Sequence, residues 1–355
     1  MVYLKDTHNF NQPDFNDKPG LNKKRRLKIF GGIFLLVLIS YFVFSITGNS
    51  KTIEVQNNTQ KTDSLWQKMA TLLNIISEPD DPDYLMPLEE KDRFDVLILG
   101  VRGENDPDAK DGGALLTDTI IVFSFDRSTK KSSLVSIPRD FYVKIDKNKK
   151  EKINSAYEYG YYHKDGGINY SKDLVSKISG VYIDKAVVID FSSFEKIVDQ
   201  VGGIDLVLAK PFEEKQQWSY EFFLPAGPNH LNGKDALYYA RSRFSSNDFD
   251  RARRQQEVIL ALKNKLTNLN FLSDPVKTLG TLSTVISNIK TDINIWNTKE
   301  LLNLSKELNS TEKIKKHVFT TDNMVYESRV NEAYILLPKG DNFVQIKQLF
   351  QDILK

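Results

Sequence analysis

The sequence predicts an α/β protein: a layered α-β-α domain with a central mixed sheet, preceded by one N-terminal transmembrane helix. Short apolar runs typical of buried strands recur from residue 94 onward. Segments with apolar residues at helical spacing separate these runs. This interleaving indicates a sheet with helices on both faces. One long apolar run near the N-terminus predicts the membrane helix.

The apolar run covers residues 29–46, carries no charge, and is about long enough to span a bilayer as a helix. Five basic residues occupy positions 23–28, whereas only Lys51 follows closely. By the positive-inside rule, we expect a single-pass protein of the cell membrane with a cytoplasmic N-terminus and an extracytoplasmic main domain. A cleaved signal peptide is the alternative. It is disfavoured because its apolar region is usually shorter and residues 45–49 make a poor cleavage site.

Changes in composition predict five regions along the chain. Residues 1–28 are a cytoplasmic tail, 29–46 the transmembrane helix and 47–91 an extracytoplasmic stalk and linker. Residues 92–270 form the main domain, and 271–355 form a C-terminal extension packed on it.

The elements of the main domain follow from local patterns. Helical spacing runs over residues 170–178 and 191–201, and the glycine pair after residue 201 stops the second helix. In the C-terminal extension, helices are predicted around residues 301–308 and 343–350, with a strand or extended segment at 334–338. Buried strands are predicted at residues 94–100, 119–125, 133–138 and 185–190.

Composition excludes several classes of protein. The chain has no cysteine, which rules out thiolate catalysis, disulfides and cysteine-based zinc sites. Its 49 basic and 47 acidic residues leave a net charge of +2. This balance argues against a protein that coats nucleic acid, so any basic site must be local, and we expect no nucleic-acid partner.

Residues 241–256 form the most distinctive segment, with five arginines and no lysine in a chain otherwise rich in lysine. Arginine is a planar, permanently charged fork that binds phosphate oxygens through two parallel hydrogen bonds. The segment therefore indicates recognition of phosphate. The alternative is a solvated basic face on a surface helix.

A helix is predicted from Phe249 to about Leu266. Asp248 either serves as its N-cap or orients the arginines that face inward. Its first turn offers a positive dipole end that favours an anion. The apolar stripe of this helix consists of Val258, Ile259, Leu262 and Leu266.

Helical projection sorts the polar side chains of this helix by direction. Arg251 and Gln255 fall inside the apolar stripe, and Arg254 lies on its edge. Arg253 and Gln256 project away from it, towards solvent. Because arginine shares the buried stripe, the projection favours an inward-facing anion site over a solvated face.

Six short motifs occur in order along the main domain. They are Thr-Asp-Thr at 117–119, Ser-Ile-Pro-Arg-Asp at 136–140, Lys-Ile-Asn-Ser-Ala-Tyr at 152–157, Asp-Gln-Val-Gly-Gly-Ile at 199–204, Leu-Asn-Gly-Lys-Asp-Ala-Leu at 231–237 and the arginine segment. Each motif alone is weakly specific, but the ordered set with compatible spacing is strongly so. In these motifs the chain resembles the LytR–CpsA–Psr family over about residues 94–265.

The resemblance implies a membrane-anchored phosphotransferase of the cell envelope. Such an enzyme takes a glycopolymer from a polyprenyl-pyrophosphate carrier in the membrane lipid and joins it to a peptidoglycan acceptor through a phosphodiester. A pyrophosphatase side activity is a further expectation. The alternative function is a non-catalytic polyprenyl-phosphate-binding sensor or scaffold that regulates envelope assembly.

Matching motif positions imply the site residues. Pyrophosphate ligands would be Arg139, Arg241, Arg243, Arg251 and Gln255, with Arg254 and Arg102 as further candidates. The catalytic set would be Asp118, Arg139, Arg241 and Arg243.

Asp118 corresponds to the family's metal-binding aspartate, and the expected cofactor is Mg²⁺ (or Mn²⁺). The family commonly has a second acidic residue in a Gly-x-Asp pattern, and this chain has Arg102 in that position. Arg102 could instead contact phosphate. The acidic loop that follows is a candidate source of a replacement ligand, a calcium site or simply a solvated turn, and its acidic residues include Asp106, Asp108 and Asp111.

Overall fold

The computed structural model describes residues 84–268, 289–293 and 313–355, apart from 105, 107, 108, 110–112, 148 and 219. The predicted cytoplasmic tail, transmembrane helix and most of the stalk lie outside these residues, as does the helix predicted around 301–308. Within the described residues, no helix combines the length and apolarity needed to cross a membrane.

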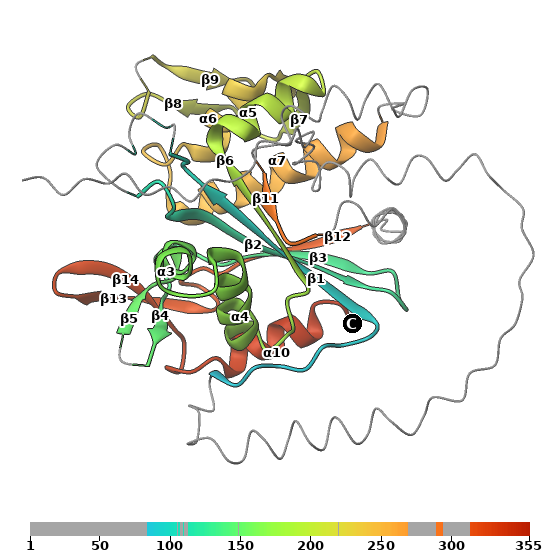
Figure 1. Ribbon diagram of the computed structural model, residues 1–355. Coiled ribbons are helices and arrows are strands. Elements are labelled where there is room, and N and C mark those ends of the chain that lie inside the picture. The colour runs from blue at the N-terminus through green and yellow to red at the C-terminus, as the bar shows by residue number, and fades with distance from the viewer. Residues whose placement is uncertain are drawn as a thin grey trace, which may run out of the picture.

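A six-stranded mixed sheet forms the centre of the domain, in the order β11-β6-β1-β2-β3-β12 (Figure 1). Strand β1 runs parallel to β6 and antiparallel to β2, while β3 runs antiparallel to β2 and parallel to β12. This confirms the predicted central mixed sheet. The strands are β1 (Arg93–Val101), β2 (Thr117–Asp126), β3 (Ser132–Ser136), β6 (Lys185–Asp190), β11 (Lys290–Thr291) and β12 (Ile314–Val318).

Alternation of side chains along β1 gives the sheet two cores. Phe94, Val96 and Ile98 pack into one hydrophobic cluster, whereas Leu97 and Leu99 pack into the other. Because successive residues of a strand point to opposite faces, one continuous apolar run supplies both layers. The run is buried on both sides, which explains its lack of polar alternation.

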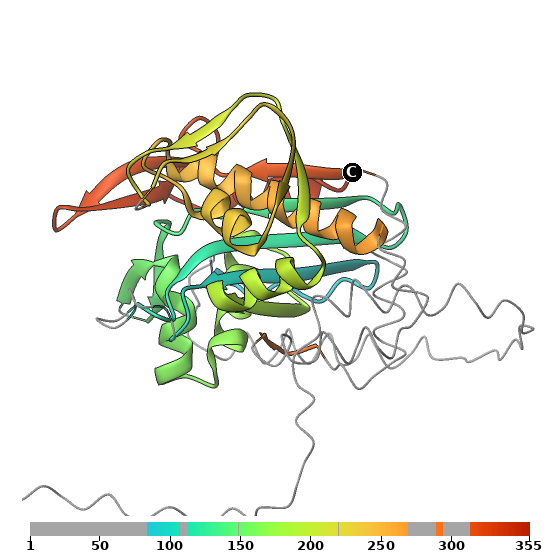
Figure 2. The same cartoon turned by 90° about the horizontal axis from the view of Figure 1, so that it is seen from above.

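One face of the sheet is covered by three helices, α5 (Phe191–Gln200), α6 (Gly233–Arg241) and α7 (Asp248–Asn268). Seen from above, α7 lies across the strands (Figure 2). After α5, Gly202 and Gly203 adopt φ values of +76° and +81°, which end the helix where the sequence predicted. Two small antiparallel pairs complete this layer: β7 (Ile204–Leu208) with β10 (Gly227–Leu231), and β8 (Phe212–Glu214) with β9 (Phe222–Leu224).

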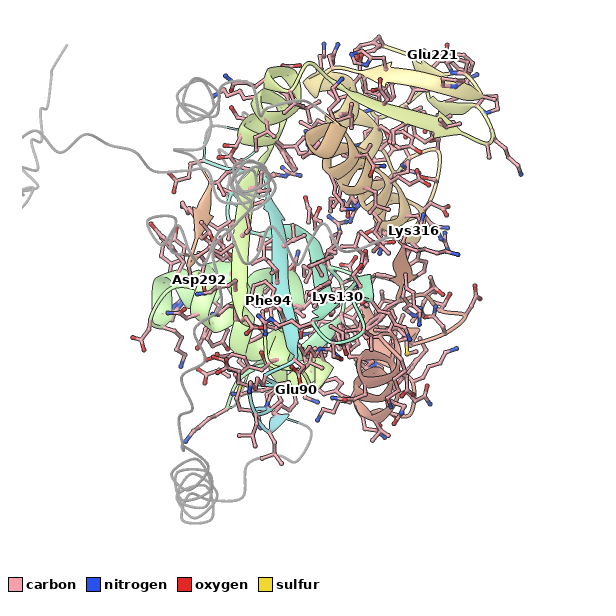
Figure 3. The ribbon with its side chains drawn as sticks, turned by 90° about the vertical axis from the view of Figure 1, so that its right-hand side faces the viewer. Glu90, Phe94, Lys130, Glu221, Asp292 and Lys316 are labelled. Carbon is pink, nitrogen blue, oxygen red and sulfur yellow. The ribbon has the colours of Figure 1, made fainter. Side chains whose placement is uncertain are left out.

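The β8–β9 pair lies at one end of the molecule. Figure 3 shows Glu221, just before β9, at the opposite end from Glu90, which precedes β1.

The other face carries α3 (Ala156–His163), α4 (Gly167–Ser179) and α10 (Val344–Asp352). Their core contains the fully buried rings of Phe141, Phe319 and Phe350. Strand β14 (Ala333–Pro338) and helix α10 confirm the elements predicted at 334–338 and 343–350. The remaining elements of this side are β4 (Tyr142–Asp146), β5 (Lys149–Lys152), the 3₁₀ turn η4 (Ile153–Ser155), β13 (Val325–Val330) and β14 (Ala333–Pro338).

A buried ion pair closes the amino end of β1. The Arg93 guanidinium donates to both carboxylate oxygens of Asp95, at 2.6 and 3.1 Å. It also donates to the backbone oxygen of Phe350 at 2.7 Å and to Ser124 Oγ at 3.1 Å. The backbone N–H of Asp95 in turn donates to Asp184 Oδ2 at 2.8 Å. This cluster fixes β1, β2 and the C-terminal helix to one another.

Candidate functional site

A cavity opens at the carboxyl ends of the parallel strands β1 and β6, between the sheet and helices α5, α6 and α7. Its empty volume, counted to include the open mouth, is about 910 Å³. Ligands of open α/β sheets commonly bind beyond the carboxyl ends of the strands, so the position itself indicates a binding site.

Much of the cavity wall is apolar. The ends of β1 and β6 supply part of this wall, and the inward faces of the three helices supply the rest. Such a wall can accept a hydrocarbon chain without unpaired polar groups. The apolar lining residues are Ile98, Leu99, Ile189, Phe191, Phe194, Leu237, Ala240, Val258 and Ile259.

The polar part of the wall is dominated by arginine. Among the described lining residues, the acidic ones are Asp118 and Asp190, so guanidinium groups outnumber carboxylates. Concentrated positive charge beside low-dielectric walls strengthens attraction for an anion. The cavity therefore combines an apolar volume with an anion site. The arginines that line it are Arg102, Arg139, Arg241, Arg243 and Arg251.

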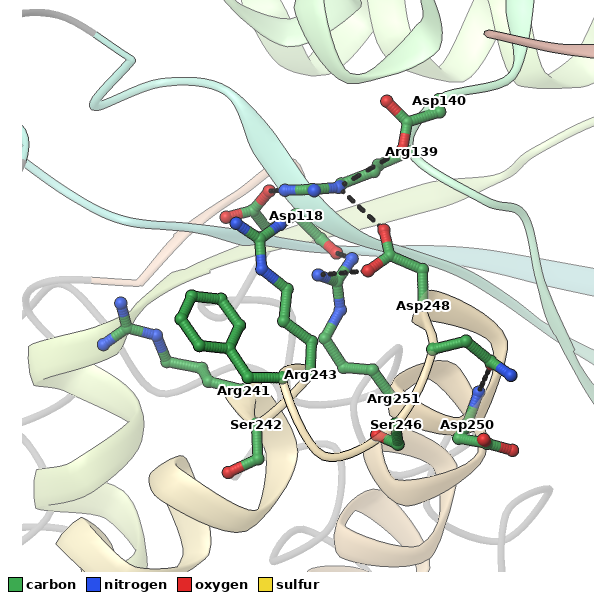
Figure 4. Close-up of polar contacts among 12 residues, drawn as sticks. Asp118, Arg139, Asp140, Arg241, Ser242, Arg243, Ser246, Asp248, Asp250 and Arg251 are labelled. Carbon is green, nitrogen blue, oxygen red and sulfur yellow. Dashed lines mark hydrogen bonds and ion pairs between the residues drawn. The ribbon is translucent and has the colours of Figure 1, made fainter. Parts of the chain in front are cut away.

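Arg139 joins the sheet to the start of α7 through carboxylates (Figure 4). Its guanidinium contacts Asp118 Oδ1 at 2.7 Å, Asp248 Oδ2 at 3.1 Å and Asp140 Oδ2 at 3.6 Å. Burial alone would lower the pKa of Arg139, but the charges of Asp118 and Asp248 raise it well above its usual value. Arg139 therefore remains charged.

Arg251 lies in the first turn of α7, and only 6% of its surface is exposed. Nη1 pairs with Asp248 Oδ1 at 3.2 Å, and Nη2 donates to the backbone oxygen of Asp118 at 3.4 Å. The Nε–H group is buried and has no hydrogen-bond partner among the residues that the structure describes. Burial lowers the pKa of Arg251, and Asp248 only partly opposes that effect. A buried guanidinium with an unused donor in this cavity is suited to an incoming anion.

The start of α7 corrects one prediction. Asn247, not Asp248, caps the helix, because Asn247 Oδ1 accepts from the backbone N–H of Asp250 at 2.8 Å. Asp248 is already the first helical residue, and its carboxylate contacts Arg139 and Arg251. The N-cap prediction was therefore wrong, whereas the alternative role, orienting the inward arginines, matches the contacts.

Asp118 lies at the beginning of β2, where the cavity meets the sheet. Burial alone would raise its pKa, but the charges of Arg139, Arg251 and Arg102 bring it below the usual value. Asp118 is therefore a stable carboxylate and a poor proton acceptor at neutral pH.

Arg102 lines the cavity next to Asp190, where the chain makes a tight approach. Gly103 has φ +92°, and a Cβ on it would lie 2.8 Å from Asp190 Cβ. Glycine is thus required for the loop to bring Arg102 to this position. The side chain of Asp190 caps α5 by accepting from Ser193 N at 2.7 Å.

The predicted substitute carboxylates do not gather at the cavity in the part of the chain that is described. Asp106 is half-buried but is not among the lining residues, and its charge acts on Glu195. Asp108 and Asp111 lie outside the described residues. Among those described, no group of three or more His, Asp or Glu side chains is placed to hold a metal ion.

Three other predicted residues also line the cavity. The Arg241 guanidinium lies 4.0 Å from the centre of the Phe191 ring. The Arg243 guanidinium points towards Asp118 in Figure 4. Gln255 is half-buried, and its Nε2 approaches the backbone oxygen of Ala240 at 3.5 Å. The structure thus brings Asp118, Arg139, Arg241, Arg243, Arg251 and Gln255 together.

Arg254 is not part of this wall. It is buried behind it, where Nε donates to the backbone oxygen of Tyr239 at 2.9 Å and Nη2 donates to that of Ser242. Its guanidinium also lies over the Phe212 ring at 4.8 Å. Arg254 therefore holds α7 to the end of α6 and does not face a ligand.

The prediction that Gln256 faces solvent was wrong. Only 1% of its surface is exposed, and its Nε2 donates to Ser136 Oγ and to the backbone oxygen of His317, both at 2.8 Å. Strands β3 and β12 cover this side of α7, and a helical projection carries no information about distant strands. Arg253 does face solvent, with a side chain 52% exposed.

The sequence missed several cavity residues. Gln217 lies in the polar connection between β8 and β9, where no motif marks it. Asp190, Phe191 and Phe194 line the cavity from the junction of β6 and α5. The rule that ligands bind beyond strand ends was the available signal for the last three.

Comparisons with known proteins agree with the arrangement. The LytR_cpsA_psr family matches residues 40–351. The Bacillus licheniformis polyisoprenyl-teichoic acid–peptidoglycan teichoic acid transferase TagU is 31% identical over 281 residues, which cover 76% of this chain and 84% of TagU.

Solved structures share the fold. Bacillus subtilis TagV matches with a TM-score of 0.58 and 28% identity, over 75% of this chain and 98% of TagV. The family protein YwtF (TagT), solved with bound octaprenyl pyrophosphate lipid, matches with a TM-score of 0.53 and 22% identity, over 79% of this chain and 94% of that one.

Proposed function

Because this chain belongs to the LytR–CpsA–Psr family, we propose that it is a phosphotransferase that moves a glycopolymer from a polyprenyl-pyrophosphate carrier onto peptidoglycan. One observation carries the proposal: a single cavity has five arginines beside an apolar wall. An isoprenyl pyrophosphate has the same two parts, an anionic head and a hydrocarbon chain. The name of TagU states the matching donor and acceptor classes for a relative.

The transfer exchanges one phosphorus–oxygen bond for another. An acceptor hydroxyl of peptidoglycan attacks the phosphorus that bears the glycan, and the bond from that phosphorus to the bridging oxygen breaks. The products are a glycan joined by a phosphodiester and a polyprenyl monophosphate, and the proton of the attacking hydroxyl passes to the departing phosphate or to water. Negative charge grows on the departing phosphate, so the reaction depends chiefly on positioning and charge stabilisation.

The residues of the cavity divide these tasks. Arg139, Arg241, Arg243 and Arg251 bind the pyrophosphate oxygens and stabilise the departing phosphate. Asp118 orients Arg139 and, because its pKa is lowered by these arginines, does not act as the general base. Gln255 contributes an amide group beside them, and Arg102 is a further phosphate contact.

A divalent cation, Mg²⁺ or Mn²⁺, fits this donor set through Asp118. Mg²⁺ commonly uses one or two protein carboxylates and completes its coordination with phosphate oxygens and water. The side chain of Asp118 is 22% exposed, so it can be shared between Arg139 and a cation. Bound there, the cation would neutralise charge on the pyrophosphate. Pyrophosphatase side activity would follow when water replaces the acceptor hydroxyl.

The proposed location is the outer side of the cell membrane, with residues 29–46 as the single anchor and residues 1–28 in the cytoplasm. The uncharged run and its basic flank support this topology. An anchored domain would meet a lipid-borne donor at the membrane and the cell-wall acceptor outside it.

The test uses the full-length protein in detergent, a polyprenyl-pyrophosphate-linked glycan, peptidoglycan fragments and Mg²⁺. We expect release of polyprenyl phosphate together with transfer of glycan to the fragments, and an Arg139→Ala variant should lose most of this turnover. Tight lipid binding by the wild-type protein without any release, with Mg²⁺ present, would reject the enzyme. That outcome would favour the sensor or scaffold, the alternative motivated by Arg102 at the usual acidic position.

A further inference from the structure

Residues 214–218, which we name the clamp, hydrogen-bond to the segment that carries Arg241 and Arg243. Gln217 contacts both arginine positions: its Nε2 donates to the backbone oxygen of Arg241 at 3.2 Å, and its Oε1 accepts from the backbone N–H of Arg243 at 2.7 Å. Between them, Trp218 Nε1 donates to Ser242 Oγ at 3.0 Å. The clamp therefore fixes the backbone that connects the two arginines.

Glu214 anchors the other end of this contact and is fully buried. Its Oε2 accepts from the backbone N–H groups of Phe244 and Ser245 at 3.1 and 3.0 Å, and from Ser245 Oγ at 3.1 Å. Its Oε1 accepts from the backbone N–H groups of Gln216 and Gln217 at 3.2 and 3.4 Å. One carboxylate thus joins the clamp to the loop after Arg243.

The charge state of Glu214 suits this role. Burial alone would raise its pKa, but the hydrogen bonds from Ser245, Gln216 and Gln217 lower it below the usual value. Glu214 is consequently ionised at neutral pH. Hydrogen bonds to a charged acceptor are stronger than those between neutral groups.

Aromatic contacts extend the clamp to the Arg241 side chain. The guanidinium of Arg241 lies 4.0 Å from the Phe191 ring centre and 5.4 Å from that of Trp218. Trp218 itself stacks on Tyr238, with ring centres 4.1 Å apart and planes 5° from parallel. The backbone of Arg241 and its charged group are therefore both positioned from outside its own helix.

We propose that the clamp, and Glu214 and Gln217 in particular, positions Arg241 and Arg243 for recognition of the pyrophosphate, an inference that rests on the proposed function. Both arginines line the cavity, but each has a long side chain that must be ordered before it can bind two oxygens at once. Fixing the backbone in advance lowers that cost upon binding. Glu214 would act through the arginines without touching the ligand.

Removing the charge of Glu214 should change the affinity for an anion in opposite directions, depending on whether Glu214 acts through its electrostatic potential or by positioning the arginines. Loss of a negative charge near an anion site should tighten anion binding if only long-range potential matters. Loss of the anchor should weaken binding if Glu214 orders the arginine loop. Glu214→Gln keeps the size of the side chain and tests this sign directly.

The neighbouring residue provides a matched control. Glu213 has a side chain 40% exposed and pairs with Lys215 at 2.8 Å. Glu213→Gln is the same chemical change, one position away and outside the clamp. Full-length wild-type and variant proteins in one detergent are titrated with geranyl pyrophosphate and with geraniol, the uncharged tail. Partitioning of each probe into detergent is the same for all variants and cancels in the comparison.

We expect Glu214→Gln to raise the Kd for geranyl pyrophosphate about tenfold, equivalent to about 1.4 kcal/mol. The Kd for geraniol should change less than twofold, and Glu213→Gln should leave both values within twofold. Unchanged or tighter geranyl pyrophosphate binding by a folded Glu214→Gln protein would overturn the proposal. Equal losses for both probes would also overturn it, because they indicate general loosening of the cavity.

Gln217→Ala keeps the proposal testable if Glu214→Gln does not fold. Removing the amide that joins Arg241 to Arg243 should raise the Kd for geranyl pyrophosphate about fivefold and spare geraniol. No selective loss would reject the clamp. Failure of the wild-type protein itself to prefer geranyl pyrophosphate over geraniol is a different outcome, which rejects the proposed function and the clamp with it.

Discussion

The two ends of strand β1 both bury arginine beside aspartate, and they use the pair in different ways. At the amino end, Arg93 binds Asp95 through two contacts and finds further acceptors in Phe350 and Ser124. At the carboxyl end, several guanidinium groups surround Asp118, and the buried Nε–H of Arg251 has no partner within the described part of the chain.

The difference lies in how completely the charges are matched. A buried pair with every donor satisfied holds elements together and offers nothing to a ligand. A site with more cations than carboxylates is completed only when an anion arrives. The same residue types can thus serve stability or binding, and the balance of charge and hydrogen bonds decides which.

The largest effect is expected at the amino end of β1, where the buried charges are matched. Arg93→Ala would leave Asp95 buried without its cation, at a cost of about 3–5 kcal/mol in the free energy of unfolding. Urea denaturation of the full-length protein measures this loss. Variant protein that remains folded should bind geranyl pyrophosphate with wild-type affinity. A selective loss of affinity would show that the two ends of β1 are not independent.

At the open end, Arg251→Ala should raise the Kd for the carrier lipid, or lower turnover, roughly a hundredfold. The substitution removes a buried charge that faces the proposed pyrophosphate site, and a hundredfold change corresponds to about 2.8 kcal/mol at about 1.4 kcal/mol per tenfold. Thermal melting should show a folded protein. A variant that melts far below wild type but binds normally would assign Arg251 to stability and contradict the comparison.

The two ends should also respond to pH with opposite sign. Burial, with the nearby charge of Asp95, raises the pKa of Asp184 to about 6, so the folded state takes up a proton there that the unfolded state releases. Its contribution to stability is therefore present below pH 3.8, the usual value, and is lost as pH rises through about 6. The pKa of Asp118 is lowered instead, so its contribution is lost as pH falls.

Asp184→Asn isolates the first of these effects. Relative to wild type, it should be more stable by about 1 kcal/mol at pH 7, after allowance for solvent screening of a partly exposed group, and equal at pH 4. Parallel melting curves across this pH range provide the measurement. A difference that grows as pH falls would mean that Asp184 is stabilised as a carboxylate.

The smallest effect is expected from Arg253→Ala. This arginine is two residues from Arg251, but it faces solvent and pairs with Asp250 on its own helix. Exposed pairs of this kind contribute little, so carrier affinity and turnover should change less than about threefold. Losses equal to those of Arg251→Ala would mean that the helix presents a different face to the ligand.

Local sequence patterns predicted most of the strands and helices, and they predicted that Arg251 faces inward. The strands at 94–100 and 185–190 were recognisable because a strand buried on both faces is apolar throughout. The inward direction of Arg251 followed from helical geometry alone. These inferences succeeded because their causes lie within one turn or one strand.

The remainder depended on distant contacts. Gln256 is buried because β3 and β12 cover its side of α7, and Arg254 binds the end of α6 instead of facing the cavity. Glu214 and Gln217 gain their roles only when the loop after α6 folds back upon them. Residue spacing within one segment carries no information about these long-range contacts, so sequence patterns could not identify them.

The contact between Arg93 and Phe350 spans 257 positions of the chain. Strand β12 likewise pairs in parallel with β3, Ile314 opposite Ser132. Contacts of such long range slow folding, because loop entropy is lost before they form. During synthesis, Arg93 and Asp95 therefore cannot complete their contacts until helix α10 has left the ribosome. Shortening the chain before Phe350 would delete this acceptor together with a fully buried ring of the second core, although Phe350 itself does not line the cavity.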